Sequence, residues 1–229
     1  MLTAKNFKAV LMLPCVVMKN PKMIFFRIPK NASTSLHRGY LQPNYVTLNM
    51  KTNKTGFTKF LEEVTFDWFE EAFKFTFVRN PWDRFVSLYV YFTTYAPKKK
   101  GSPLADRWEG PIPSFEEFVL NFEKICETRD DIRSHAIKQT TFAYHKEWKF
   151  VDFIGRFESL KKDFDHVREE LGLKIEPLEH MMQTEHEHYS LFYNDRTRRK
   201  VTRLYQADIE NFGYRFYQSK LVARGSDLS

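Results

Sequence analysis

The sequence predicts an α/β domain with a central, mostly parallel sheet. Met23 to Ile28 is a continuous apolar run with one arginine, Phe73 to Val78 alternates, and Phe150 to Phe157 is a third strand candidate. A helical pattern follows each of these strands, and strands that alternate with helices are typical of parallel sheets. Because ligands bind such sheets at the carboxyl ends of the strands, functional residues are expected where each strand ends.

Two helices have clear start signals. Asn80 stands where an N-cap is expected, with Pro81 at the first helical position. Ser114 with Glu117 three residues later forms a capping box, which opens a helix predicted over Phe115 to Phe122.

Two further helices are predicted in the second half of the chain. Ser159 caps a helix whose end is signalled by Gly172, and Asp195 opens a last one. The residues of that last helix recur at intervals of three and four: Val201, Leu204, Tyr205, Asp208, Ile209 and Phe212.

Composition favours one ordered globular domain over residues 1–229. The chain has 229 residues, of which 42% are hydrophobic and 17% aromatic, so a large aromatic core is expected. Its 36 Lys and Arg against 29 Asp and Glu give a formal charge of +7. That excess suits an anionic ligand, a nucleic acid or an acidic polymer, and charge alone does not choose among them.

Cysteine usage and hydropathy point to a cytoplasmic protein without a transmembrane segment. Cys15 and Cys126 lie far apart and outside any CxxC context, which fits a reducing compartment better than a disulfide framework. The apolar run Ala9 to Met18 is broken by Pro14 and is too short to span a bilayer.

The first candidate site follows the strand that begins at Met23. The segment IFFRIPKNASTSL reads as a buried strand, a short turn of small and hydroxyl residues, and a helix start. Backbone N–H groups at such a junction can converge on an anion, and Lys30 adds a full positive charge. It is not a Walker A loop, because GxxxxGK[ST] is absent. An ordinary loop with a solvent-facing lysine is the alternative for this segment alone.

The second candidate site is the segment FTFVRNPWDRFVSLY. Arg79 stands at the ligand edge of its strand, and Ser87 lies two helical turns past Asn80 on the same helix face. A guanidinium and a hydroxyl placed in this way can bind a terminal phosphate. The structural alternative is that Arg79 pairs with Asp83 or another carboxylate.

Together the two segments resemble sulfotransferases that use 3′-phosphoadenosine 5′-phosphosulfate (PAPS), in particular the carbohydrate sulfotransferases and their bacterial relatives. PKNASTS is similar to the 5′-phosphosulfate loop of that family, and FVRNPWDRFVSLY to its 3′-phosphate motif. DFIGRFESL and YQADIENFGY resemble two later family segments, so the resemblance runs from about Met23 to Tyr214.

The resemblance implies a P-loop-like, three-layer α/β/α fold and a single sulfotransferase domain that transfers a sulfonate from PAPS to a hydroxyl of a carbohydrate or glycoconjugate. The other product is 3′-phosphoadenosine 5′-phosphate (PAP), and no metal is needed. Lys30 corresponds to the family's catalytic lysine, and Phe157 falls where relatives place an aromatic against adenine, although a buried core position is equally compatible. The expected cofactor-binding residues are Lys30, Asn31, Ala32, Ser33, Thr34, Ser35, Arg79, Ser87 and Phe157.

The general base departs from the family pattern. Tyr45 stands where relatives carry a histidine, and a tyrosine with a pKa near 10 is a poor base at neutral pH. His135, in a stretch that resembles a His-x-x-x-Gln segment bordering the acceptor site, is the leading candidate, with an acceptor-binding or structural role as the alternative. Glu109 and Glu116 are weaker candidates, and His37 is expected to point outward.

Other polar clusters are interpreted as solvated surface. The histidines near residue 185 have no metal-ligand partner cluster, and the basic run Arg196 to Arg203 is a solvated face or, alternatively, a contact for a polyanionic acceptor. In the family the acceptor is read by variable loops, here Ala96 to Pro113.

Three other functions compete with sulfonate transfer. A nucleotide-dependent phosphotransferase would need Mg²⁺ held at a strand-end Asp, and no predicted strand ends in that way. A nucleic-acid-binding module lacks any RNP-type, helix-turn-helix or zinc pattern, so nucleic acid is not expected as a partner. A non-catalytic protein that binds PAPS or PAP is the third, because of Tyr45.

Overall fold

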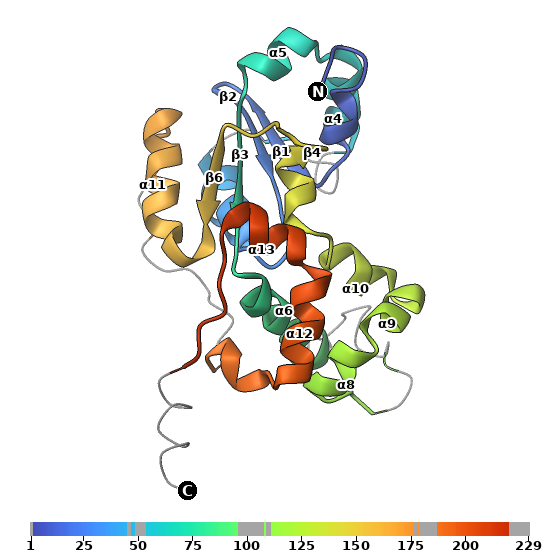
Figure 1. Ribbon diagram of the computed structural model, residues 1–229. Coiled ribbons are helices and arrows are strands. Elements are labelled where there is room, and N and C mark those ends of the chain that lie inside the picture. The colour runs from blue at the N-terminus through green and yellow to red at the C-terminus, as the bar shows by residue number, and fades with distance from the viewer. Residues whose placement is uncertain are drawn as a thin grey trace, which may run out of the picture. The chain divides into compact units, whose positions relative to one another are not determined.

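A computed structural model describes residues 2–44, 47–48, 54–95, 108, 111–175, 178 and 187–219. The chain forms two compact units (Figure 1). The first unit comprises Met1–Arg79 and Gln139–Gln183, and the second comprises Asn80–Lys138 and Thr184–Ser229.

The first unit is built on a four-stranded sheet of order β1-β2-β3-β6. Its strands are β1 (Cys15–Lys19), β2 (Lys22–Phe26), β3 (Phe73–Val78) and β6 (Phe153–Arg156). The three strands β2, β3 and β6 run parallel, and only the edge strand β1 is antiparallel to its neighbour. The prediction of an α/β fold with a mostly parallel sheet is therefore confirmed.

The edge strand β1 was not among the predicted strands. The apolar run Ala9 to Met18 divides at Pro14 into α1 (Lys8–Leu11) and β1, because proline cannot continue the helix. The Asn20-Pro21 dipeptide then forms the turn that brings β1 back against β2. The third predicted strand, Phe150 to Phe157, is shorter than expected: β6 begins only at Phe153, and Phe157 leaves the sheet and opens a single 3-10 turn.

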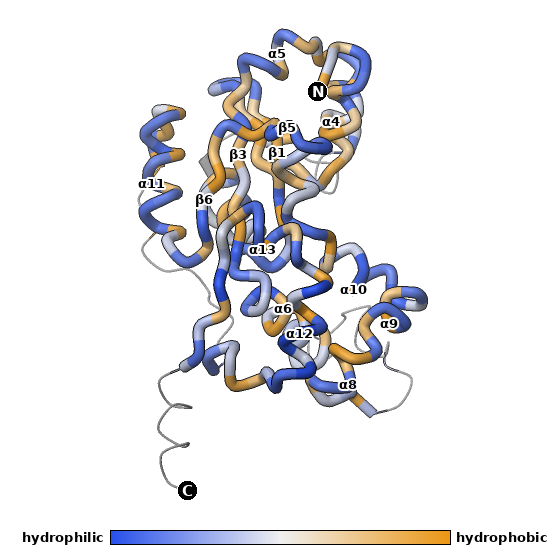
Figure 2. Tube along the Cα trace, in the orientation of Figure 1, coloured by the Kyte–Doolittle hydropathy of each residue, from blue (hydrophilic) through white to orange (hydrophobic). Residues whose placement is uncertain are grey.

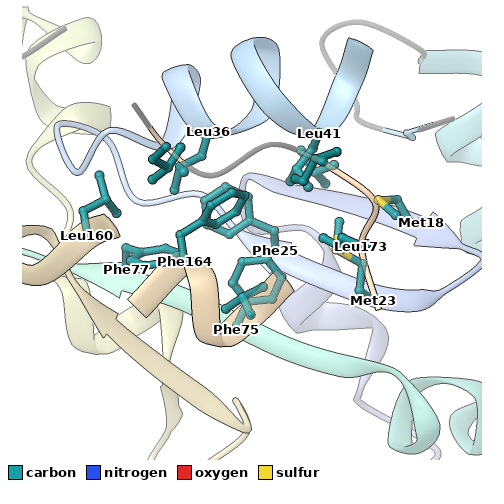
Figure 3. Packing of buried hydrophobic residues seen from close by; sticks show 14 residues of the cluster. Met18, Met23, Phe25, Leu36, Leu41, Phe75, Phe77, Leu160, Phe164 and Leu173 are labelled. Carbon is teal, nitrogen blue, oxygen red and sulfur yellow. The ribbon is translucent and has the colours of Figure 1, made fainter. Parts of the chain in front are cut away.

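A phenylalanine-rich core fills one face of this sheet. Phe25 of β2 and Phe75 of β3 are register partners whose rings stack at 4.8 Å, and Phe77 meets both edge-on. Leu36 and Phe164 cover them from two helices (Figure 3). Full burial of each such side chain contributes roughly 1.5–3 kcal/mol, so this face supplies much of the unit's stability.

The helices on this face are one interrupted helix after β2 and α11 after β6. The first consists of α2 (Ser33–Ser35), the π-helical turn η1 (Leu36–Leu41) and α3 (Gln42–Asn44). The second, α11 (Leu160–Glu170), is mostly hydrophilic in Figure 2 and turns its few apolar residues to the sheet. Close packing also explains Gly155, where a Cβ would lie 2.4 Å from a ring carbon of Phe77.

The remaining elements of the first unit lie between these strands in sequence. They are α4 (Lys54–Glu63), α5 (Phe66–Glu71), the 3-10 turn η3 (Gln139–Phe142) and a small hairpin of β4 (Tyr144–His145) and β5 (Trp148–Lys149). Phe26, on the sheet face opposite Phe25, contacts Phe150 edge-on at 5.1 Å.

The second unit is helical in its described residues. Its elements are α6 (Pro81–Val90), η2 (Tyr91–Tyr95), α8 (Phe115–Leu120), α9 (Phe122–Thr128), α10 (Asp130–His135), η5 (Tyr189–Phe192), α12 (Asp195–Leu204) and α13 (Gln206–Phe212). Phe85 is at the centre of this unit, with the rings of Phe118, Phe122 and Tyr205 at 5.8, 4.9 and 6.1 Å. The expected aromatic core is thus present in both units.

The predicted helix caps at Asn80 and Ser114 are confirmed, whereas Ser159 precedes α11 without a side-chain capping bond and two helices break earlier than predicted. Asn80 Oδ1 accepts from the backbone N–H of Trp82 at 3.1 Å, and Ser114 forms its capping box with Glu117. The helix that opens at Ser114 ends at Leu120 instead of residue 122. The last predicted helix breaks at Tyr205, whose hydroxyl donates to the Ala136 carbonyl at 2.9 Å. Apolar periodicity continues across that break, so the pattern does not reveal it.

Most of the predicted acceptor loop, residues 96–107 and 109–110, lies outside the described residues. Among the helices that are described, none combines the length and the hydropathy needed to cross a membrane.

Candidate active site

The loop after β2 has the backbone geometry of an anion-binding turn. Lys30 and Ala32 have φ values of 70° and 58°, in the left-handed region that non-glycine residues rarely adopt. Each such residue costs about 1 kcal/mol, and strain of this kind clusters at ligand-binding sites. In anion-binding turns, alternation between right- and left-handed residues turns successive N–H groups toward one point. The helix that starts at Ser33 adds its N-terminal dipole.

Buried polar contacts hold this loop against the sheet. Asn31 is completely buried, and its Nδ2 donates to the Phe77 carbonyl and to Gln139 Oε1, both at 2.7 Å. Its Oδ1 is buried without a hydrogen-bond partner in the described structure, and it can accept from a hydroxyl of a bound molecule. The sequence singled out Asn31 as a loop residue but not Gln139 as its partner, since the two are 108 positions apart.

Arg79 lies directly after β3, and its guanidinium joins the loop. Nη1 donates to the Lys30 carbonyl at 3.1 Å, and Cζ lies 4.1 Å from the ring centroid of Phe157. The structure therefore brings together three residues that the sequence assigned to cofactor binding, from the ends of β2, β3 and β6. Phe157 is partly buried against the core and stacks on Arg79.

The hydroxyl residues of the loop form the first helical turn. Ser33 is buried, Ser35 is half-buried and Thr34 is exposed, where its Oγ1 accepts from Arg27 Nη2 at 3.1 Å. Arg27, the residue that follows β2, thus adds a second guanidinium beside the loop, and its Nε is buried without a partner in the described part of the chain.

Ser87 belongs to the second unit, in the middle of α6. Its side chain is 1% exposed, and Oγ has no hydrogen-bond partner within the described residues. A buried hydroxyl left in this state costs about 1–3 kcal/mol, so such groups in native proteins call for a ligand, ion or water. A phosphate oxygen is a suitable acceptor for this hydroxyl.

His135 also belongs to the second unit, at the end of α10. Its Nδ1 lies 2.7 Å from the Asp131 carbonyl, which can only accept, so the neutral ring carries its hydrogen on Nδ1 and keeps Nε2 as an acceptor. The ring stacks on Tyr91 at 6.0 Å and meets Phe92 edge-on at 5.3 Å. Arg84 Nη2 donates to the His135 carbonyl at 2.9 Å. This ring is therefore held in a defined orientation and tautomer.

The prediction that His37 points outward is wrong. Its side chain is completely buried, and Nε2 lies 3.1 Å from Thr47 Oγ1. Burial, together with the positive charges of Arg27 and Arg38, lowers the pKa of His37 to about 4. His37 lies in the π-helical turn η1, and packing of the interrupted helix turns the His37 side of this turn inward. The short polar stretch in the sequence does not show which side of the helix is buried.

The structure gives a location for only one of the other candidates for the general base. Tyr45 and Glu109 lie outside the described residues. Glu116 is exposed in the first turn of α8, where Oε1 accepts from Asn194 Nδ2 at 3.1 Å. A carboxylate in that setting is solvated.

No metal centre is found within the part of the chain that the structure describes, where no three His, Cys, Asp or Glu side chains are grouped closely enough. His188 instead serves as the N-cap of η5, with Nδ1 accepting from the Ser190 N–H at 3.3 Å. In the basic run, Arg198 pairs with Asp195 and Lys200 with Glu123.

Comparison with known proteins identifies the family of the chain. The model of the sulfotransferase family matches residues 14–215, so the chain belongs to that family, whose reaction is the transfer of a sulfonate group. An uncharacterized protein of Archaeoglobus fulgidus is 30% identical over 116 residues, which cover 47% of this chain and 74% of the relative. No solved structure gives a significant match.

Proposed function

We propose that the protein transfers the sulfonate of PAPS to a hydroxyl group of a carbohydrate or glycoconjugate acceptor. The observation that carries the proposal is the contact of Arg79 with the strained loop at Lys30, 3.1 Å between Nη1 and the carbonyl oxygen. It joins an anion-binding turn to a guanidinium at the end of the neighbouring parallel strand. A nucleotide phosphorylated at both 5′ and 3′ positions needs two such anion sites.

The residues present fit this donor. The loop contains the left-handed residues Lys30 and Ala32 and the positive charge of Lys30, and Ser87 has a buried hydroxyl without a hydrogen-bond partner among the described residues. When bound, PAPS would supply an activated sulfonate with a phosphate leaving group. No metal is required for this assignment, since lysine and backbone amides can stabilise the charge that develops on the leaving oxygen.

Each residue of the proposed site then has a specific role. Lys30 and the loop amides Asn31 to Ser35 hold the 5′ end, and Arg79 and Ser87 hold the 3′-phosphate. His135, with Nε2 as the acceptor nitrogen, takes the proton of the attacking hydroxyl. The ring of Phe157 packs against the Arg79 guanidinium, so only part of this ring is left for a contact with adenine.

The proposal treats residues 1–229 as one sulfotransferase domain made of both compact units. The family match supports it, because residues 14–215 include parts of each unit. The excess of basic residues supports an acidic or polar acceptor.

Two measurements test this function. Calorimetry should show saturable binding of PAP that AMP does not match, because AMP lacks the 3′-phosphate. Incubation with labelled PAPS and a panel of sugars, glycolipids and phenols should then transfer label to a sugar hydroxyl. PAP binding without transfer to any acceptor would favour a non-catalytic binding protein, whereas transfer from ATP that depends on Mg²⁺ would favour a phosphotransferase.

A further inference from the structure

Gln139 is a completely buried amide that hydrogen-bonds to two parts of the candidate site. Its Oε1 accepts from the Arg79 backbone N–H at 2.8 Å and from Asn31 Nδ2 at 2.7 Å. Its Nε2 donates to the Arg79 backbone carbonyl at 2.8 Å. One side chain from η3 is thus bonded to both the loop after β2 and the end of β3.

These hydrogen-bond partners allow only one orientation of the side-chain amides of Gln139 and Asn31. The Arg79 backbone offers one donor and one acceptor, which Gln139 matches as a strand neighbour would, so its oxygen and nitrogen cannot be exchanged. Asn31 then faces two acceptors, Gln139 Oε1 and the Phe77 carbonyl, and must present its nitrogen to them. The orientation of Asn31 therefore follows from that of Gln139.

The hydrogen bonds between Gln139 and the Arg79 backbone take the place of sheet hydrogen bonds beyond the last β3–β6 register pair. The last register pair between β3 and β6 is Val78 with Arg156, so the Arg79 backbone has passed the end of this ladder. Gln139 satisfies both backbone groups of Arg79 there and keeps the residue in line with its strand. It does so while holding the strained loop at Asn31.

We infer that Gln139 is a positioning residue, which sets the conformation of the loop at Lys30 and Ala32 and aligns it with Arg79. The inference deepens the proposed function, and it rests on that function only for the identity of the ligand. Gln139 acts through Asn31 and the Arg79 backbone, and it needs no contact with substrate. Without it, the two left-handed residues lose a buried tether to the sheet, and the loop is expected to relax.

The test compares Gln139→Met, which keeps the side-chain length and removes the amide, with Gln206→Met as a control. Gln206 lies on α13 and is exposed, and its Nε2 donates to Glu210 Oε1 at 2.8 Å. In the ligand-free protein, hydrogen exchange of residues 29–36 should accelerate by roughly tenfold or more in Gln139→Met, and not in the control. PAP affinity should fall by about ten- to a hundredfold, since up to three buried hydrogen bonds are lost.

A second variant separates positioning from general destabilisation. In Gln139→Glu the introduced carboxylate can still accept from Asn31 and Arg79 but cannot donate to the Arg79 carbonyl, whereas its protonated form can do both. PAP affinity of this variant, divided by that of the wild type at the same pH, should therefore increase as the pH falls. A ratio that does not change with pH would count against the inference.

The wild-type protein gives a test that needs no variant. The side-chain amide protons of Gln139 and the backbone amide of Arg79 should exchange slowly by NMR, and rapid exchange of both would overturn the inference. Unchanged loop exchange in a folded Gln139→Met protein would overturn it as well. If the wild type fails to bind PAP, the proposed function fails, while the exchange measurements still decide the role of Gln139.

Discussion

Arg79 Nη1 donates a hydrogen bond of 3.1 Å to the backbone carbonyl of Lys30, across 49 positions of sequence. The guanidinium thereby spans the ends of two parallel strands, and Phe157 packs beneath it at 4.1 Å. A positive side chain held in this way is ordered before any ligand arrives, so less side-chain entropy is lost on binding. Predictions for the proposed site follow from this contact and from the residues around it.

Arg79→Ala should weaken PAP binding by roughly 2–4 kcal/mol, because a buried charge-assisted contact is lost. Calorimetry with PAP measures the effect. Arg196→Ala, at an exposed position on α12, is the matched control and should leave affinity unchanged. Equal affinities of wild type and Arg79→Ala would remove Arg79 from the site.

Lys30→Ala should lower kcat more than it raises the KM for PAPS. A lysine on the leaving oxygen acts mainly when charge develops in the transition state. Alanine and lysine are both non-glycine residues, so the strain of the left-handed backbone at position 30 is similar in the variant. The variant therefore tests the ammonium group more than the conformation of the turn. Steady-state kinetics with PAPS checks the prediction, and a change in KM alone would make Lys30 a binding residue only.

His135→Ala should reduce kcat by roughly 10²- to 10⁴-fold, because proton transfer by a positioned side chain contributes about that much. PAP affinity should be nearly unchanged. His166→Ala, at an exposed position on α11, controls for loss of a histidine elsewhere. Wild-type turnover in His135→Ala would return the role of the base to Tyr45 or to a carboxylate.

Activity should survive EDTA. In the proposed function, Lys30 and the loop amides stabilise the negative charge that develops on the leaving group of the donor, so no divalent ion is needed. Turnover before and after chelation, with and without added Mg²⁺ or Zn²⁺, tests the point. Activity that EDTA abolishes and a divalent ion restores would favour the phosphotransferase alternative.

Burial of His37 should make the protein less stable in mild acid. Its pKa is about 4 in the folded state, below the ordinary value of 6.5, so the unfolded chain binds the proton more readily. Stability from this group is complete above pH 6.5 and is lost as the pH falls toward 4. The loss between pH 7 and 5 should be about 2 kcal/mol.

Urea unfolding at both pH values measures that loss. His37→Asn should show a smaller difference between pH 7 and 5 than the wild type, even if it is less stable at both. The same change at His145, on the β4–β5 hairpin, should retain the wild-type difference. A wild-type free energy of unfolding that is equal at the two pH values would contradict the assignment.

Local chemistry in the sequence determined the elements that need no distant partner. Asn80 and Ser114 cap their helices through neighbours within three residues, and β3 has the predicted bounds, although both of its faces are buried. The two candidate site segments can likewise be found from the sequence, since each places a basic residue at the end of an apolar strand. Helix ends at Leu120 and Tyr205 were missed, because packing interrupts a periodicity that continues.

By itself, then, the sequence determined the α/β class, the loop at Lys30 and the position of Arg79 at a strand end. Tertiary structure alone decided that Gln139 joins Asn31 to Arg79 and that His37 is buried. Those facts depend on which residues meet across 108 positions of chain and on which side of a helix packs inward. Hydrogen bonds and desolvation act at contact distance, and only the folded chain creates those contacts.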